Sequence, residues 1–469
     1  MDKLVKNIRE AIRLTGLRSG DTISFHHHLR NGDFVLNMVM DEVAATGIKD
    51  LTINASSLFD THTPLLEHIK NGVVRKIQTD YMAAGVGHAI SEGIMNEPVE
   101  FRTHGGRPSD MELGRTPIDV AFIAAPTSDT MGNCTGKIGK SACGSLGYAF
   151  PDAMNAKKTV VITDNLVSYP LLSWSISENY IDYVVCIDAI GDPNGIVSGT
   201  TRITRDPVGL IMAERAAQVI KASGLLRDGF SFQTGAGGAT LAAAQFLKDI
   251  MLRENIHGSF GLGGITGYMV DMLNAGCFDA LLDVQCFDLK AVESIRENPK
   301  HREISASHYA GPSSASAAVD SLDVVLLGAT EVDTDFNVNV HTDSNGYIMG
   351  GSGGHSDTAA GAKLSIIIAP LFRARLPIIT DRVGCISTPG KDVDVLVTQG
   401  GIAVNPKNSE LSDRLSQSGL NIVDIHELKR KAEKLTGVPK KHDHAEKVAA
   451  EVIYRDGTPL DRIYCVKEN

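Results

Sequence analysis

The sequence predicts an α/β protein built from two similar open α/β domains with largely parallel sheets. Short runs of β-branched, apolar residues, such as 159–163 and 365–368, indicate buried strands. They alternate with helical segments such as 206–223 and 239–253, as is typical of parallel sheets covered on both faces. The second observation is an internal repeat, which indicates that one such unit occurs twice.

The repeat consists of matches that occur in the same order in both halves of the chain. Residues 118–125 (IDVAFIAA) resemble residues 322–329 (LDVVLLGA), and the pattern Asp-Thr-x-x-Asn follows each of them, at Asp129 and at Asp333. Ordered matches favour a duplication. The alternative is that all α/β units share apolar strands, so that unrelated strands also match.

A charged, glycine-containing link at residues 221–229 predicts the boundary between the halves. We therefore expect one domain at residues 1–224 and a second at residues 225–469. The second domain is expected to end in a hairpin, because two strand-like segments near the C-terminus flank a turn that contains Gly457.

Composition excludes several classes of protein. The formal net charge of -11 over 469 residues argues against a nucleic-acid partner, which needs a clustered basic face. No apolar run approaches the roughly 18 residues of a membrane span, and the N-terminus lacks a signal-peptide pattern. The 7 cysteines are dispersed without a Cys-x-x-Cys pair, which favours reduced thiols. We therefore expect a cytoplasmic protein that does not bind membranes.

Three glycine-rich turns in the second half, at residues 234–238, 261–264 and 350–354, predict a binding site. Glycines at strand-to-helix turns let a ligand approach the backbone, and helix N-termini offer N–H donors to an anion. Thr240 and Thr266 stand where a dinucleotide fingerprint needs its third glycine, so a nicotinamide cofactor is disfavoured. Tight packing is the alternative for any single turn.

Several polar residues are candidates for the same site. His26 and His27 follow a strand, and without a matching set of further ligands they predict anion binding or packing rather than a metal. Glu331 follows a strand end, where open α/β sheets bind ligands, and is a catalytic or orienting candidate as well as a potential surface carboxylate. Arg107 suits a carboxylate-rich substrate, although a solvated arginine is the competing explanation.

Over nearly its whole length the chain resembles the CoA-transferase superfamily and, within it, the citrate lyase alpha subunit family. The motifs that carry the resemblance are His104-Gly105-Gly106-Arg107, Cys143-Gly144-Ser145-Leu146-Gly147-Tyr148-Ala149, Leu282-Asp283-Val284-Gln285, Gly353-Gly354-His355-Ser356-Asp357-Thr358 and Gly401-Ile402-Ala403-Val404-Asn405-Pro406. The resemblance implies two CoA-transferase-like domains that exchange acetyl for citryl on an acyl carrier protein. It also implies a CoA-like prosthetic arm on that carrier (the gamma subunit), a separate citryl lyase (the beta subunit), citrate and an acetyl thioester as substrates, and no metal.

The expected chemistry has two steps. A citrate carboxylate attacks the thioester carbonyl to give a mixed anhydride, and the released thiolate then attacks the citryl carbonyl. Both tetrahedral intermediates carry an oxyanion that backbone N–H groups can stabilise, and we expect the turn at residues 351–354 to supply them. The expected catalytic residues are Gly351, Ser352, Gly353, Gly354 and Glu331. The expected substrate-binding residues are His26, His27, Arg107, His355 and Asp357. The expected residues for the prosthetic arm are Gly235, Gly237, Gly238, Gly261, Gly263 and Gly264.

One departure from related enzymes bears on the mechanism. In another branch of the superfamily a glutamate nucleophile follows an Ile-His pair, whereas here Ile256-His257 is followed by Gly258-Ser259. The resemblance therefore implies a ternary complex without an acyl-enzyme. Two alternatives stay open: a free-CoA acyl transferase or thioesterase with Glu331 as nucleophile, and a non-catalytic scaffold subunit.

Overall fold

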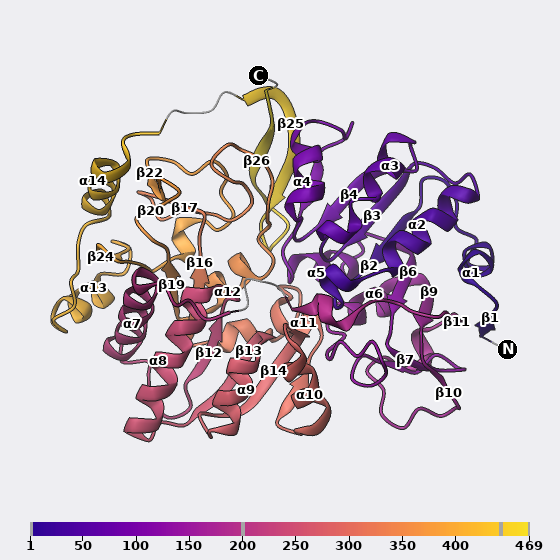
Figure 1. Ribbon diagram of the computed structural model, residues 1–469, viewed down its shortest axis with the longest axis horizontal. Coiled ribbons are helices and arrows are strands. Elements are labelled where there is room, and N and C mark those ends of the chain that lie inside the picture. The colour runs from indigo at the N-terminus through magenta and orange to yellow at the C-terminus, as the bar shows by residue number, and fades with distance from the viewer. Residues whose placement is uncertain (1–2, 198–201, 440–443, 468–469) are drawn as a thin grey trace.

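The computed structural model describes residues 3–197, 202–439 and 444–467. Two large sheets form two halves that lie side by side (Figure 1). The first sheet is built from the N-terminal part of the chain and the last two strands, and the second is built from the part between them. Helices pack against both sheets, so the strands near the centre of each sheet are buried. All residues of β3 (Leu51–Ala55) and β19 (Leu364–Ile368) are buried, as expected for continuous apolar strands between helical layers.

The first sheet has 10 strands, of which all but the last pair are joined in parallel. Its spatial order is β1 (Leu4–Val5), β11 (Tyr183–Cys186), β9 (Ala156–Thr163), β6 (Ile118–Ala124), β2 (Thr22–Phe25), β3, β4 (Val74–Thr79), β5 (Val99–Phe101), β25 (His444–Ile453) and β26 (Pro459–Val466). The helices of this half are α1 (Ile8–Thr15), α2 (Val35–Ala45), α3 (Leu65–Lys70), α4 (Ala84–Ser91), α5 (Gly106–Glu112) and α6 (Ala149–Asn155).

The second sheet has 8 strands and is parallel except at one edge, where the last pair is antiparallel. Its spatial order is β15 (His301–Glu303), β14 (Phe278–Cys286), β13 (Gly258–Ile265), β12 (Ser231–Thr234), β16 (Val324–Gly328), β19, β23 (Val395–Thr398) and β24 (Gly401–Val404). The remaining helices are α7 (Pro207–Ala222), α8 (Gly238–Glu254), α9 (Gly267–Asn274), α10 (Leu289–Glu297), α11 (Ala306–Ala310), α12 (His355–Gly361), α13 (Ser409–Ser416) and α14 (Ile425–Thr436). Short 3-10 helices are η1 (Arg30–Gly32), η2 (Asp60–His62), η3 (Glu178–Tyr180), η4 (Pro193–Ile196), η5 (Ala318–Ser321) and η6 (Gly390–Asp392).

The two sheets repeat one topology, which confirms the predicted fold class. Starting from β2 and from β12, the neighbours on either side follow in the same order, β3–β4–β5 against β13–β14–β15 and β6–β9–β11 against β16–β19–β23. A small sheet is repeated as well. It contains β7 (Thr127–Asp129), β8 (Cys134–Thr135) and β10 (Leu166–Val167) in one half, and β17 (Glu331–Asp333), β18 (Val338–Asn339) and β22 (Ile379–Thr380) in the other. A separate pair is β20 (Phe372–Arg373) with β21 (Leu376–Pro377).

The repeated Asp-Thr-x-x-Asn pattern has a structural role. Asp129 accepts hydrogen bonds from the backbone N–H and the side-chain amide of Asn133. Asp333 binds the backbone and side chain of Asn337 in the same way. Each aspartate thereby satisfies the donors of the turn between two short strands, which explains why the pattern occurs in both halves.

The end of the chain joins the halves. Strands β25 and β26 form the predicted antiparallel hairpin, and β25 pairs with β5, so the hairpin extends the first sheet and stands beside α4 in Figure 1. Helix α7 precedes the predicted boundary at residue 224, yet it contacts α8, β19 and β23 of the second half. The domain limits at residues 1–224 and 225–469 stay a prediction. Among the helices of the described residues, none is both long and apolar enough to cross a membrane.

Candidate functional site

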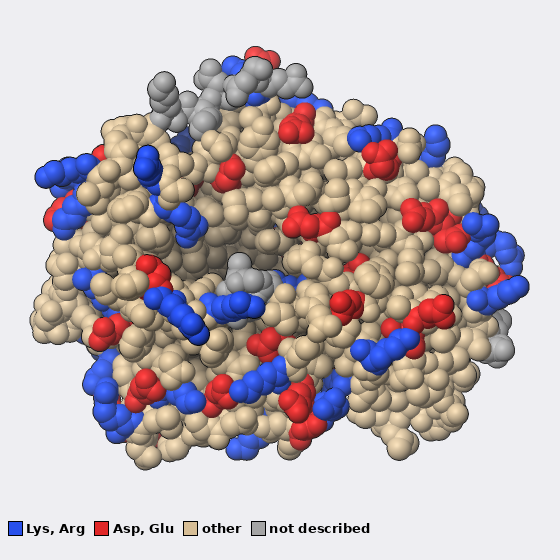
Figure 2. All heavy atoms as spheres, in the orientation of Figure 1, with Lys and Arg blue, Asp and Glu red and all other residues tan. Residues whose placement is uncertain are grey.

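The carboxyl ends of strands from both sheets meet between the two halves. His27 follows β2, Asp80 follows β4 and His104 follows β5, while Gln285 lies at the end of β14. The Gln285 side chain donates a hydrogen bond to the His27 backbone oxygen over 3.0 Å, which links the two edges directly. Figure 2 shows that the face in view is hollowed in its middle, with Lys and Arg side chains on the rim of the hollow. Strand ends that meet at a crevice are the usual ligand site of open α/β sheets.

His27 is packed among other rings at this junction. Its ring centroid lies 4.6 Å from that of Tyr148 and 5.6 Å from that of His104. Its Nδ1 atom lies 2.6 Å from the Ser56 hydroxyl oxygen. Burial lowers the pKa of His27 well below its usual range, so the ring is neutral near pH 7. His27 therefore takes part in this cluster as an uncharged hydrogen-bonding ring.

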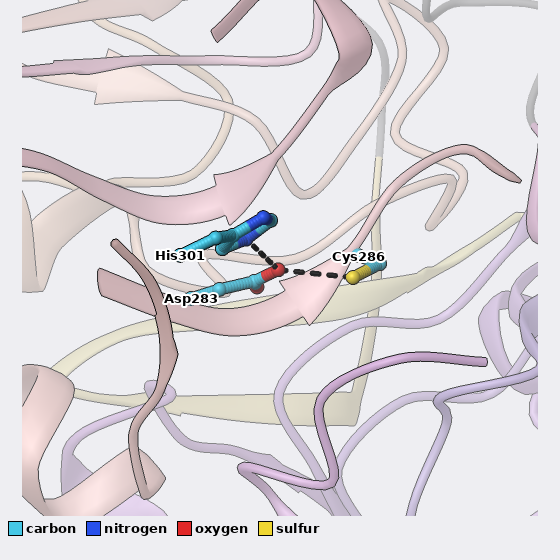
Figure 3. A group of neighbouring side chains, drawn as sticks. All are labelled: Asp283, Cys286 and His301. Atoms are coloured by element: carbon cyan, nitrogen blue, oxygen red, sulfur yellow. Dashed lines mark hydrogen bonds and ion pairs between the residues drawn. The ribbon is translucent and has the colours of Figure 1, made fainter. Parts of the chain in front are cut away.

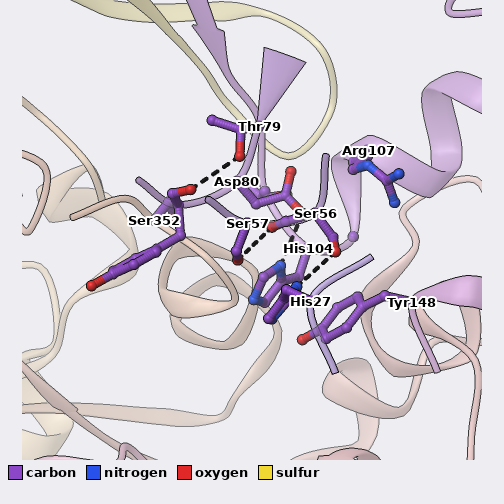
Figure 4. A network of polar contacts seen from close by, with 12 residues as sticks. His27, Ser56, Ser57, Thr79, Asp80, His104, Arg107, Tyr148 and Ser352 are labelled. Atoms are coloured by element: carbon purple, nitrogen blue, oxygen red, sulfur yellow. Dashed lines mark hydrogen bonds and ion pairs between the residues drawn. The ribbon is translucent and has the colours of Figure 1, made fainter. Parts of the chain in front are cut away.

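His104 and Asp80 form a hydrogen-bonded pair in the same cluster (Figure 4). The His104 Nδ1 and Asp80 Oδ2 atoms are 2.9 Å apart, and the aspartate is fully buried. Burial raises the pKa of Asp80, while the bond to His104 opposes that rise. An aspartate on Nδ1 fixes the ring and leaves Nε2 for chemistry. Sequence reasoning did not select this pair, although the His-Gly-Gly run after a strand was a signal for His104.

The glycine turn at residues 351–354 lies directly on the first half. The Gly353 N–H donates to the Asp80 backbone oxygen over 3.0 Å, and the His104 N–H donates to the Gly353 oxygen over 2.9 Å. Gly353 has φ of +51°, and a Cβ there would lie 3.2 Å from His104 Nε2. A Cβ on Gly351 would lie 2.4 Å from the Asp80 backbone oxygen. Glycine is needed at both positions because backbone or ring atoms occupy the space of a side chain.

Some N–H groups of this turn are already bonded. The Gly353 N–H binds Asp80, and the Ser352 N–H donates to His341 Nε2 over 3.3 Å. The Ser352 hydroxyl lies 2.8 Å from the Ser356 hydroxyl and is buried. Within the described part of the chain, the Gly351 and Gly354 N–H groups have no hydrogen-bond acceptor. These two amides are the ones that remain available to an oxyanion.

Asp357 ties the second half to the first. It accepts hydrogen bonds from the Thr103 hydroxyl at 2.8 Å and from the Gly105 N–H at 2.9 Å. Arg455 lies 3.6 Å away, yet burial raises the pKa of Asp357 to about 6. His355 next to it is bonded inside the second half, through Nε2 to the Gly328 oxygen and through Nδ1 to Thr388. Burial lowers the pKa of His355 to about 4.

Two other residues predicted to bind substrate form hydrogen bonds within the first half. The buried Arg107 guanidinium donates to Asn54 Oδ1 over 2.6 Å and to Asp152 Oδ2 over 2.9 Å. His26 Nε2 accepts the Ala124 N–H over 2.9 Å, and burial lowers the pKa of His26 to about 4. Both side chains thus stabilise the strand ends of this half.

The remaining glycines fall into two groups. Gly235, Gly237 and Gly238 form the turn between β12 and α8, and Gly237 at the helix N-cap is exposed and has no side-chain cap. Gly261, Gly263 and Gly264 lie within β13, where side chains fill the space of a Cβ. Those side chains belong to Met269, Leu281, Gln233 and Phe287. In the first group the Gly235 N–H is bonded to the Leu326 oxygen over 2.8 Å, which leaves the N–H groups of Gly237 and Gly238 for a ligand. The second group is explained by packing.

Glu331 lies in a separate place. Its Oε2 atom accepts hydrogen bonds from the Asn339 side chain and the Gly384 N–H, each over 2.9 Å. It lines a cavity of about 540 Å³ between β22 and β26, together with residues such as Asp461 and Tyr464. None of the other predicted site residues lines that cavity.

Ser259 lies at the start of β13, at the opposite edge of the sheet from the carboxyl ends. Its hydroxyl donates to the Gly229 oxygen over 2.8 Å, and His257 Nδ1 is 3.0 Å from the Gly276 oxygen. The two side chains are therefore bonded to backbone groups rather than to each other.

One buried group has the composition of a metal site. Asp283 Oδ2 lies 2.9 Å from His301 Nε2 and 3.0 Å from Cys286 Sγ (Figure 3). Burial raises the pKa of the Cys286 thiol well above its usual range, so the thiol is protonated and donates to the carboxylate. These contacts join Asp283 and Cys286 of β14 to His301 of β15.

Comparison with known proteins adds the family to this geometry. The family model described as "Citrate lyase, alpha subunit (CitF)" matches residues 1–466. The citrate lyase alpha chain of Haemophilus influenzae is 49% identical over 466 residues, covering 99% of this chain and 93% of the relative. That of Klebsiella pneumoniae is 49% identical over 467 residues, covering 100% and 92%.

Solved structures lead to the same family. The citrate lyase alpha subunit of Streptococcus mutans, solved in complex with citrate, has a TM-score of 0.98 and 49% identity, covering 100% of this chain and 92% of that one. A malonate decarboxylase alpha subunit from Acinetobacter baumannii, at 17% identity and a TM-score of 0.69 over 93% of each chain, shares the fold. With a full-length family match and relatives at this level of identity, the chain belongs to the citrate lyase alpha subunit family.

Proposed function

We propose that this chain is a citrate CoA-transferase that converts an acetyl thioester on an acyl carrier protein into the citryl thioester. Family membership supports the reaction class, and a relative has been solved with citrate. The observation that carries the proposal is the Asp80–His104 pair, held against the backbone of Gly353 where the carboxyl ends of both sheets meet. That place combines an oriented imidazole with backbone donors, which acyl transfer requires.

The reaction proceeds by exchange of acyl groups in a ternary complex. A citrate carboxylate oxygen attacks the thioester carbonyl, the carbon–sulfur bond breaks, and a mixed citryl–acetyl anhydride and a thiolate form. The thiolate then attacks the citryl carbonyl and acetate leaves. The N–H groups of Gly351 and Gly354 stabilise the oxyanions, and losing one such donor typically costs about 2.7–4 kcal/mol. His104 is oriented by Asp80, which binds Nδ1 and leaves Nε2 for the sulfur. The protonated ring gives its Nε2 proton to the departing thiolate, and the Nε2 lone pair takes that proton back before the sulfur attacks the citryl carbonyl.

The prosthetic arm and its carrier are the implied partners. We propose that a CoA-like arm enters between the halves and that its phosphates bind near the turn at Gly235 to Gly238, at the N-terminus of α8, where Gly237 is exposed. The gamma subunit carries the arm and the beta subunit cleaves the citryl thioester. Because all 7 cysteines are free thiols, we place the complex in the cytoplasm.

A transferase or thioesterase with Glu331 as nucleophile is the second candidate, because this carboxylate lines its own cavity. The two mechanisms differ in a covalent intermediate. Wild-type protein and a Glu331→Gln variant are incubated with acetylated carrier alone and then treated with hydroxylamine. We expect no hydroxamate on the protein and full exchange in the variant once citrate is added. An acyl hydroxamate at Glu331 would establish the second candidate instead.

The proposal itself is tested by exchange. Acetylated carrier and citrate are mixed with the purified chain, and the carrier's mass is followed as acetyl is replaced by citryl. We expect the citryl carrier and one acetate for each exchange. A chain that exchanges nothing with any thioester donor, yet assembles the carrier and the beta subunit, would be a scaffold, and the proposed function would be wrong.

A further inference from the structure

Arg30 lies at the junction of the halves and has no anionic partner among the residues that the structure describes. Its guanidinium carbon lies 5.4 Å from the Phe59 ring centroid and 4.8 Å from that of Phe287. Its Nη1 atom is buried and has no hydrogen-bond acceptor among the described residues, and Arg30 forms no ion pair with any of them. Burial lowers the pKa of Arg30, which shows that its charge is held at a cost.

The neighbouring arginines of this half differ. Arg107 is bonded to Asp152, and Arg102 lies 2.8 Å from Glu100. Charges that lose contact with water are normally paired, so the half-buried Arg30, which receives only ring contacts from the described side chains, is the exception. Two aromatic faces stabilise such a cation but leave its in-plane N–H donors unused. Arg30 is therefore preorganised to donate to an anion that arrives from outside the chain.

The backbone of Arg30 supports a functional role. Its φ is +52°, a left-handed conformation that non-glycine residues rarely adopt and that is enriched at ligand sites. The Arg30 N–H donates to the His27 oxygen over 3.0 Å, which binds this turn to the histidine cluster. The tight approach of Gly32 to the Asp192 backbone fixes the turn from the other side. The arginine is thus held rigidly in place.

Arg30 lies close enough to the proposed reaction site for an anion bound there to be part of the substrate. Phe59 follows β3 in the first half and Phe287 follows β14 in the second, so Arg30 lies between the carboxyl edges of both sheets. Tyr81 and Tyr148 interact electrostatically with it, and the Tyr148 ring stacks on His27. Arg30 is therefore a neighbour of the cluster in which His104 meets Gly353.

We propose that Arg30 binds a carboxylate of the substrate acid that does not take part in bond formation. The inference rests on the proposed function. A planar guanidinium forms two parallel hydrogen bonds to a carboxylate, and the flanking rings exclude water from them. Acetate has one carboxylate, which becomes the leaving group, whereas citrate has further ones. Arg30 thereby selects a polycarboxylate over a simple fatty acid.

Calorimetric titration of the purified chain with citrate tests the inference without the partner subunits. We compare wild-type protein with Arg30→Gln and with Arg18→Gln, a control at an exposed arginine of the same half. Arg30→Gln should weaken citrate binding about 10- to 100-fold, the range expected for loss of a charge-assisted hydrogen bond, while the control binds as wild type. Equal affinity of wild type and Arg30→Gln would overturn the inference and leave the proposed function standing. A wild-type chain that does not bind citrate would count against both.

Citrate analogues with one carboxylate replaced by a methyl group identify the group that Arg30 holds. One analogue should bind wild type more weakly than citrate but bind Arg30→Gln as citrate does, because the partner is already lost. If every analogue loses affinity equally in both proteins, the contact does not exist. If Arg30→Gln does not fold, the inference is tested by NMR on wild-type protein with ¹⁵N-labelled arginine. The Arg30 signal is assigned as the one that is missing from the spectrum of Arg30→Lys. The Arg30 guanidinium resonance should shift on addition of citrate, and an unmoved resonance would overturn the inference.

Discussion

Replacing Asp80 by asparagine tests the proposed role of the His104 ring. The carboxylate accepts from His104 Nδ1 at 2.9 Å, so the proton of the neutral ring lies on Nδ1 and the lone pair on Nε2. An asparagine amide can donate to Nδ1, which moves the proton to Nε2, on the side facing Gly353. The variant should remain folded, because the amide keeps the shape of the side chain and removes a buried carboxylate.

The expected loss of exchange rate follows from the role of the His104 ring as a general acid and base. General acid–base catalysis contributes roughly 10²- to 10⁴-fold, or about 3–5 kcal/mol of activation free energy at 1.36 kcal/mol per tenfold. We expect Asp80→Asn to lower the exchange rate within that range. His104→Gln should be as slow, and the double variant no slower than His104→Gln alone, because the two side chains act as one unit.

The assay follows the mass of the carrier as acetyl is replaced by citryl under single-turnover conditions. His426→Gln, at an exposed histidine of α14, is the matched control and should exchange at the wild-type rate. Circular dichroism and urea unfolding confirm that each variant is folded. An Asp80→Asn variant within about threefold of wild type, or losses that multiply in the double variant, would refute the acid–base role.

Three further predictions concern other parts of the site. Gly353→Ala should lower the free energy of unfolding by about 1–2 kcal/mol, because alanine is strained at φ of +51°, and should slow exchange by displacing His104; urea unfolding and rates that both match wild type would contradict this. Ser259→Ala should retain exchange, and intact-protein mass after incubation with the acetyl donor alone should show no adduct; an acetyl group abolished by this variant would exclude the ternary-complex mechanism. Asp357 has its pKa raised to about 6 in the folded state, so the folded chain holds this proton more tightly than the unfolded chain. Its contribution to the free energy of unfolding should therefore fall by on the order of 3 kcal/mol as pH rises from about 4 to 6, and Asp357→Asn should lack this decrease; superimposable pH profiles would show that Asp357 does not titrate there.

The fold was predictable because strand and helix patterns are local. Apolar strands alternating with amphipathic helices, and the repeat at Asp129 and Asp333, are visible in the sequence and correspond to two sheets of one topology. The attachment of the hairpin to β5 was not predictable, because strand pairing joins residues far apart in the chain.

The site was predicted less completely. The turn at Gly353 was visible because glycine marks a backbone that something approaches closely, and in the structure that neighbour is His104. Arg107 was selected as a substrate ligand, yet its guanidinium is bonded to Asp152 within the first half. Arg30 carries the same charge and was overlooked, because sequence alone does not reveal which cation has a carboxylate beside it.

By itself the sequence determined the α/β class, the duplication and the family, because these depend on periodicity and on motifs read along the chain. The tertiary structure decided which residues meet. It placed His104 on Asp80 and against Gly353, left Arg30 between Phe59 and Phe287, and set Glu331 in a separate cavity. The physical reason is that hydrogen bonds and charge pairing act over a few ångströms, and only the folded chain brings residues from both halves within that distance.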